Sequence, residues 1–142
     1  MIDVMERTES GETVVNGLSE NVEVNKIAKT VNILGTEYKV IEQTESDNKK
    51  LENANGLCEM HSKKIIIDTM ESAQDDVMTV EKIEDFKKKV LRHEIIHAFL
   101  YESGLWENTN AREAWATNEE MTDWIAIQSP KIFKAFQEVG CL

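Results

Sequence analysis

Residues 93–97 read HEIIH, and this pentapeptide constrains the fold more than any other part of the 142-residue chain. On an α-helix, His93 and His97 lie about 40° apart around the axis at 3.6 residues per turn, so both imidazoles can bind one metal ion. Glu94 lies roughly 60° further round, where it can reach a water on that metal instead of the metal itself. The pattern therefore predicts a helix that carries a metal site, and this spacing is typical of zinc hydrolases.

The residues around this motif predict a long helix over residues 79–103. Thr79 is a suitable N-cap residue, and Gly104 is typical of a helix end. On a helical wheel, the motif shares a stripe of roughly 100° with apolar side chains, namely those of Ile83, Phe86, Val90 and Tyr101. We therefore expect the motif to face the core of the fold and not the solvent.

The segment before this helix predicts a small, mostly antiparallel sheet of three to four short strands. Residues 31–34 and 38–42 read as two strands around a turn at Gly35. Residues 56–60 and 64–68 read as a second hairpin, and the three consecutive isoleucines in its second strand are β-branched, which favours a strand. We expect this sheet to pack on the motif-bearing helix.

The remaining segments complete the expected α+β domain. Residues 110–128 predict a second helix, which Pro130 is expected to end, and residues 131–139 predict a short C-terminal helix. Residues 1–28 are polar and acidic and are expected to be a flexible extension. The folded domain is therefore expected to span residues 29–142.

Charge and composition exclude several classes of function. The formal net charge of −11 argues against a nucleic-acid partner, and the only basic cluster, residues 87–89, reads as a solvated helix face. No stretch approaches the roughly 18 apolar residues that a membrane span needs. Cys58 and Cys141 are too few for a disulfide scaffold, so we expect a cytoplasmic protein with free thiols.

A catalytic zinc ion usually has three protein ligands and one open position, so His93 and His97 need a third partner. A metzincin would have glycine three residues and histidine six residues after the second histidine. This chain has Leu100 and Ser103 at those positions, which excludes that class.

The sequence NEEMTD at residues 118–123 supplies a better candidate for the third ligand. Glu119 flanks the apolar face of the second predicted helix, whereas Glu120 points nearly opposite to that face. Asp123 lies one turn after Glu119 on the same side, where it can accept a hydrogen bond from the far nitrogen of a ligand histidine. We predict Glu119 as the third ligand, with Glu120 and His61, which lies in a predicted turn, as the alternatives.

HEIIH followed by NEEMTD resembles the gluzincin pattern of thermolysin-type peptidases, with Thr122 at the position of the serine of that pattern. Together with the upstream segments GLCE and KIII, it is also similar to small phage- and prophage-encoded zinc peptidases. Those proteins are minimal gluzincins, akin to the ImmA/IrrE-type metallopeptidases. The resemblance covers residues 31–127.

This resemblance implies a zincin-like fold and a zinc-dependent peptidase. Zn²⁺ would be bound by His93, His97 and Glu119, and Glu94 would act as the general base toward a water on the zinc. The expected partner is a peptide or protein substrate. If residues 65–68 form the edge of the sheet, that strand would hold an extended peptide by main-chain pairing.

Other functions stay open at this point. The chain could be a regulatory protein-binding module on a metalloprotease fold, such as a phage regulator, or a hydrolase of a non-peptide substrate. An intact Glu94 favours catalysis, because binding alone needs no general base. At 142 residues the chain is not expected to hold the large C-terminal domain that supplies the oxyanion-stabilising histidine of thermolysin. The candidates for that role are Tyr38, His61, Tyr101 and Arg112.

Overall fold

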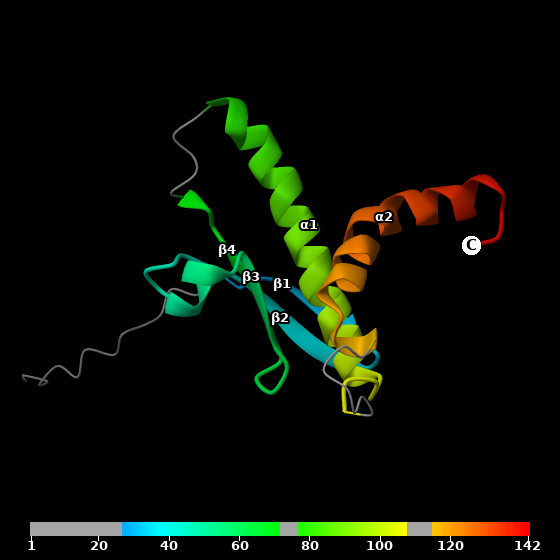
Figure 1. Cartoon of the computed structure of the whole chain (residues 1–142), viewed down its shortest axis with the longest axis horizontal. Helices are drawn as coiled ribbons and strands as arrows, with labels where there is room; N and C mark the ends of the chain where they lie inside the picture. Colours follow the sequence, from blue (N-terminus) through cyan, green and yellow to red (C-terminus); the bar gives the residue numbers. More distant parts are fainter. Residues whose placement is uncertain (1–26, 72–76, 108–114) are drawn as a thin grey trace, which may run out of the picture.

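The computed structural model describes residues 27–71, 77–107 and 115–142 and has an α+β fold, as expected (Figure 1). Its main elements are β1 (Ile27–Ile33), β2 (Thr36–Gln43), β3 (Gly56–Glu59), β4 (Lys64–Asp68), α1 (Val77–Glu102) and α2 (Glu119–Glu138). The flexible extension predicted over residues 1–28 falls on residues outside this description, except that β1 already begins at Ile27.

The four strands form one mixed sheet in the order β1-β2-β4-β3. The two outer pairs are antiparallel, but the central strands β2 and β4 run parallel, with Lys39 opposite Lys64 and Gln43 opposite Asp68. The expectation of a mostly antiparallel sheet is therefore corrected: antiparallel pairing is confined to the two hairpins. The connection over residues 44–55 carries the chain across, so that β4 and not β3 pairs with β2.

The isoleucine run of β4 explains this strand order. Ile65 and Ile67 belong to the core beside α1, and Ile66 alternates to the opposite face, where it is also buried. A strand that is apolar on both faces needs cover on both sides of the sheet, and a central strand obtains that cover more readily than an edge strand. The idea that residues 65–68 form the sheet edge is therefore wrong: the edge strands of the described sheet are β1 and β3.

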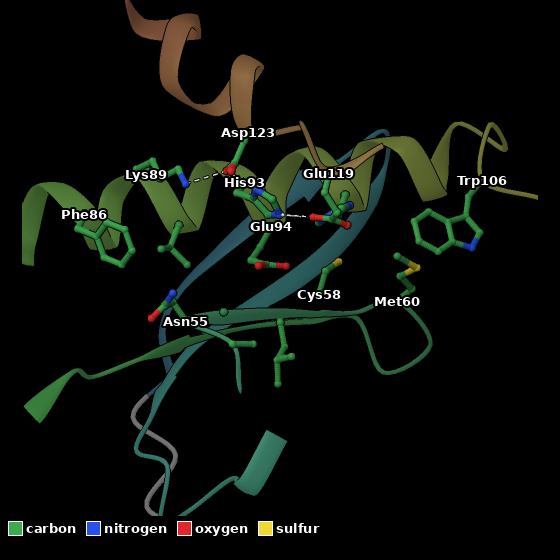
Figure 2. A pocket seen from close by; sticks show the side chains of 15 residues that line it. Asn55, Cys58, Met60, Phe86, Lys89, His93, Glu94, Trp106, Glu119 and Asp123 are labelled. Atoms are coloured by element: carbon green, nitrogen blue, oxygen red, sulfur yellow. Dashed lines mark hydrogen bonds and ion pairs between the residues drawn. The ribbon is translucent and has the colours of Figure 1, made fainter. Parts of the chain in front are cut away.

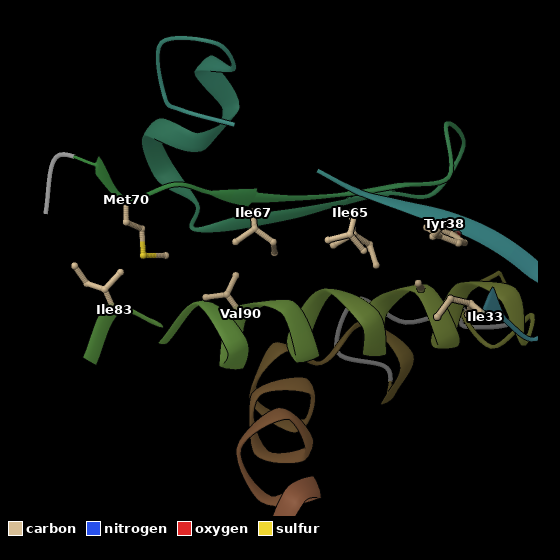
Figure 3. Packing of buried hydrophobic residues seen from close by; sticks show 9 residues of the cluster. Ile33, Tyr38, Ile65, Ile67, Met70, Ile83 and Val90 are labelled. Carbon is tan, nitrogen blue, oxygen red and sulfur yellow. The ribbon is translucent and has the colours of Figure 1, made fainter. Parts of the chain in front are cut away.

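The main hydrophobic core lies between one face of the sheet and α1 (Figure 3). α1 begins two residues before the expected Thr79 and ends at Glu102, and Gly104 follows with a positive φ of 78°. The core residues are Ile33, Tyr38, Val40, Ile65, Ile67, Met70, Ile83, Val90 and Ala98. Of the apolar stripe expected on α1, Phe86 departs most, because 40% of it is exposed.

α2 packs on the side of α1 that faces away from the sheet (Figure 3). Its expected start at residue 110 is wrong: residues 115–117 form a separate short 3-10 helix, and residues 110–114 lie outside the described ranges. Asn118 explains the later start, because it has extended backbone angles and its side chain accepts a hydrogen bond from the Met121 N–H at 2.7 Å. This is N-cap geometry, so the helix begins at Glu119.

Pro130 does not end α2, which continues to Glu138, so the expected separate C-terminal helix over residues 131–139 is also corrected. A proline inside a helix has no N–H to donate to the carbonyl four residues earlier, which here belongs to Ala126. The Arg92 side chain of α1 donates its Nε–H to this carbonyl at 2.6 Å. A neighbouring helix thus supplies the hydrogen bond that the proline removes.

The cysteines and the helices agree with what composition predicts for the described part of the chain. Cys58 and Cys141 are both free thiols, and Cys58 is half-buried in β3 whereas Cys141 is exposed. Within the described ranges, no helix is both long and apolar enough to cross a lipid bilayer.

Candidate metal centre

Three side chains from two helices converge at one point (Figure 2). His93 and His97, one turn apart on α1, bring their Nε2 atoms to 2.9 Å from each other. The Oε2 atom of Glu119, at the start of α2, lies 3.1 Å from His93 Nε2 and 3.3 Å from His97 Nε2. The structure therefore brings together the three residues that the sequence nominated as metal ligands.

This arrangement fits a tetrahedral zinc ion. Zinc binds imidazole nitrogen and carboxylate oxygen at about 2.0–2.2 Å, so the ligand atoms of a tetrahedral site are about 3.3–3.6 Å from one another. The three observed separations, 2.9, 3.1 and 3.3 Å, lie at or slightly below the lower limit of this range. His93, His97 and Glu119 offer two nitrogens and one oxygen that could hold a metal ion, and zinc held by three such ligands would keep a fourth position open.

The two alternatives for the third ligand lie elsewhere in the described structure. Glu120 is exposed and contributes no atom to the three-residue group. His61, in the turn between β3 and β4, packs edge-on against the ring of Tyr101 at a centroid distance of 6.0 Å. Among the described residues, Glu119 alone completes the pair of histidines.

Local structure at the start of α2 fixes the position of Glu119. Because Asn118 is the N-cap, Glu119 is the first residue of the helix, and its side chain remains 69% exposed. Thr122, one turn further, is fully buried, and its hydroxyl donates to the Asn118 carbonyl at 3.0 Å. Buried Thr122 and Ala126 pack this end of α2 against α1. This packing fixes the position of the Glu119 carboxylate, although that side chain is exposed.

Asp123 connects His93 to a lysine. Its Oδ1 atom accepts from His93 Nδ1 at 2.9 Å and from Lys89 Nζ at 2.7 Å. Lys89 lowers the pKa of the Asp123 carboxyl by this hydrogen bond, and His93 contributes in the same direction. An ionised Asp123 favours the His93 tautomer with its proton on Nδ1, which leaves Nε2 able to bind a cation. Lys89 was expected on a solvated face, and this contact corrects that expectation.

Glu94 is buried with 7% of its surface exposed, on the side of α1 that faces β3. Burial raises the pKa of Glu94 from 4.5 to about 7, the charge of Glu119 adds to this increase, and His93 opposes it. Burial also lowers the pKa of His97, which favours the neutral imidazole that a metal requires. His97 Nδ1 has no hydrogen-bond partner among the described residues.

A cleft of about 440 Å³ lies between β3 and α1 and contains the histidines, Glu94, Glu119 and Asp123 (Figure 2). This volume falls within the range of ordinary small-molecule sites. Burial and the nearby Glu94 charge raise the pKa of the Cys58 thiol, which also lines the cleft, to about 12. Lining residues that the sequence did not single out as functional include Asn55, Gly56, Leu57, Met60, Phe86, Lys89 and Trp106. Asn55, Gly56, Leu57 and Met60 reach the cleft because the strand order places β3 against α1, whereas Phe86 and Lys89 belong to α1 and Trp106 follows it.

The three described candidates for oxyanion stabilisation, Tyr38, His61 and Tyr101, do not line this cleft. Tyr38 is fully buried, and its hydroxyl donates to Glu102 Oε1 at 2.8 Å. Tyr101 and His61 contact each other near the end of α1, and Arg112 lies outside the described residues. Tyr38, Tyr101 and His61 therefore belong to the packing of the turn and the helix end.

The described arrangement combines a three-residue ligand group, a buried carboxylate and an open cleft beside an edge strand. A comparison of the chain with protein-family models, with curated proteins and with solved structures found no match. The function therefore has to be inferred from the chemistry of these residues.

Proposed function

We propose that this protein is a zinc-dependent peptidase. The observation that carries the proposal is the convergence of His93 Nε2, His97 Nε2 and Glu119 Oε2 beside a buried Glu94, all facing one cleft. A purely structural zinc site is normally closed by four protein ligands, whereas three ligands and an adjacent carboxylate are typical of catalytic sites. This donor set therefore favours hydrolysis over a structural role.

His93, His97 and Glu119 would hold the metal, and Asp123 would orient His93 through its Nδ1 proton. Zinc bound there would supply a Lewis acid that polarises a peptide carbonyl and lowers the pKa of water. The Lys89 ammonium keeps Asp123 ionised and in place, because it donates to the same carboxylate oxygen.

Glu94 is suited to move the proton. Its carboxylate lines the same cleft as the two histidines but stands outside the three-residue ligand group. In the proposed reaction it accepts the proton of the attacking water and later delivers it to the amine that leaves when the peptide bond breaks. The proton is thereby transferred within the cleft, and Glu94 returns to its starting form.

The edge strand supports a peptide as the substrate. β3 lines the cleft and, among the described strands, pairs with β4 alone, so the main-chain groups of its other edge can bind an extended chain. This replaces the expectation that residues 65–68 would hold the peptide. Phe86 and Trp106 lie toward opposite ends of the cleft (Figure 2) and offer apolar surface for substrate side chains.

The proposal is tested by zinc content and by cleavage of a peptide library. Glu94→Gln should retain stoichiometric zinc and lose about 10²- to 10⁴-fold in turnover, the usual contribution of a general base. Glu119→Gln should weaken zinc binding, and Glu120→Gln, the matched control on the same helical turn, should leave zinc binding and turnover unchanged.

Two results would contradict this function. Unchanged turnover in the Glu94→Gln variant would exclude the proposed general base. Zinc bound by the wild-type protein with no cleavage of any peptide would instead favour the protein-binding module.

A further inference from the structure

We propose that Gly56 is a positioning residue that determines where the Glu94 carboxylate lies. The proposal rests on the proposed peptidase function, because it assigns Glu94 its place as the general base. Gly56 is the first residue of β3 and lines the cleft opposite α1. It lies outside HEIIH and NEEMTD, the two motifs from which the metal site was predicted.

The space beside Gly56 is already filled. A Cβ atom built on Gly56 would lie 2.6 Å from Val90 Cγ1 and 3.0 Å from both Cγ and Oε1 of Glu94. Carbon atoms in van der Waals contact are normally about 3.5–4.0 Å apart. Any other residue at position 56 would therefore displace the Val90 side chain, the Glu94 side chain or the strand itself.

The backbone at Gly56 does not by itself require glycine. The positive-φ glycines of the described structure are Gly35, Gly104 and Gly140, and Gly56 is not among them. It pairs with Ile67 in the regular antiparallel ladder between β3 and β4. Glycine within a strand weakens it, and a close approach by other groups is one of the reasons for its presence. At this position the close approach is that of α1.

Val90 and Glu94 are one helical turn apart, and both face β3 at Gly56. Val90 is a core residue, so it fixes the depth at which α1 packs, and the Glu94 side chain then lies against the glycine backbone. The strand that would bind the peptide is thus also the surface against which the general base rests. Gly56 thereby links the position of the base to the position of the substrate.

The expected effect of Gly56→Ala is a loss of catalysis with nearly unchanged peptide binding. The added methyl group would push the Glu94 carboxylate away from its place, whereas alanine keeps the main-chain groups of β3 that would bind the substrate. Misplacement of a catalytic group by about 1 Å can reduce the rate by about 100-fold. We therefore expect kcat to fall by about 100-fold while KM changes little.

The design must separate this effect from simple misfolding, because the closest contact of the new methyl group is with core residue Val90. Val90→Ala removes the Cγ1 atom and with it that contact, but both Glu94 contacts remain. The informative comparison is therefore Gly56→Ala/Val90→Ala against Val90→Ala alone, since the core cavity is present in both proteins.

Stability gives a second readout that needs no catalysis. In the zinc-free Val90→Ala protein, adding Gly56→Ala should lower the midpoint of urea unfolding. In a Val90→Ala/Glu94→Ala protein, which lacks the Glu94 Cγ and carboxylate, the same addition should lower the midpoint much less. Non-additivity of this kind reports a direct contact between the two side chains.

A 100-fold lower kcat at nearly constant KM, together with a midpoint shift that depends on Glu94, would support the proposal. Equal kcat with and without Gly56→Ala, or an equal midpoint shift in both backgrounds, would overturn it. If wild-type and Val90→Ala proteins loaded with zinc cleave no peptide, the proposed function fails separately, and the unfolding comparison still decides whether Gly56 positions Glu94.

Discussion

Replacing Glu94 with glutamine should stabilise the zinc-free protein at neutral and alkaline pH. Glu94 is 7% exposed and packs between α1 and β3, where its charged form is poorly solvated. Glutamine has nearly the same shape and no charge at any pH. The substitution therefore removes the cost of burying a carboxylate while it keeps the packing.

The size of this effect follows from the pKa of Glu94. Burial raises this pKa from 4.5 to about 7, so between these values the folded protein binds a proton that the unfolded chain releases. The free energy of unfolding of the wild type therefore falls as the pH rises through this window. At about 1.4 kcal/mol per pH unit, the total loss is about 3 kcal/mol, complete above pH 7 and absent below pH 4.5.

The assay is urea unfolding of both zinc-free proteins across this pH range. The stability difference in favour of the Glu94→Gln variant should grow from nearly zero at the acidic end to about 3 kcal/mol above neutral pH. Saturating zinc should shrink it, because a neighbouring cation favours the ionised carboxylate. Glu120→Gln, at an exposed carboxylate, is the control for a general charge effect. Parallel stability curves for wild type and Glu94→Gln would show that Glu94 does not take up a proton on folding in this pH range.

Three further outcomes are expected. Asp123→Ala should weaken zinc binding by about 10- to 100-fold in a chelator competition, because His93 loses the acceptor that orients it; unchanged affinity would contradict this role. Arg92→Met should lower the free energy of unfolding by about 1–3 kcal/mol in urea, because the buried carbonyl beside the α2 proline loses its donor; an equally stable variant would show that another group replaces it. At about pH 8, iodoacetamide should label exposed Cys141 much faster than Cys58, whose pKa of about 12 keeps the thiol protonated; equal labelling rates in mass spectrometry would argue against the burial of Cys58.

The sequence predicts best those features that depend on a single helix. The 3.6-residue period is enough to expect that His93, Glu94 and His97 face inward, and Glu94 and His97 are indeed buried on α1. The same rule assigns Glu119 and Asp123 to one side of α2, and both side chains reach the histidines in the structure. Neither conclusion requires knowledge of the rest of the fold.

Most features that depend on contacts between distant segments could not be predicted, and the exception is the approach of Glu119 and Asp123 to the histidines, which the second motif indicated. The isoleucine run of β4 indicates a strand buried on both faces, but only the complete sheet shows that β3 becomes the edge. Pro130 predicts the end of a helix, and a hydrogen bond from Arg92, 38 residues earlier, lets the helix continue. Lys89 reads as a solvated residue until α2 brings Asp123 beside it.

The proposed peptidase function requires that His93, His97 and Glu119 bind one zinc ion. It is tested most directly by a crystal structure of the zinc-loaded protein, with the metal located by its anomalous scattering. We expect one zinc ion per chain, bound by Nε2 of both histidines and by the Glu119 carboxylate, with Glu94 close to the open position but not bound to the metal. A zinc ion bound by Glu120 or His61 in place of Glu119, or a chain that binds no zinc at this place, would contradict it.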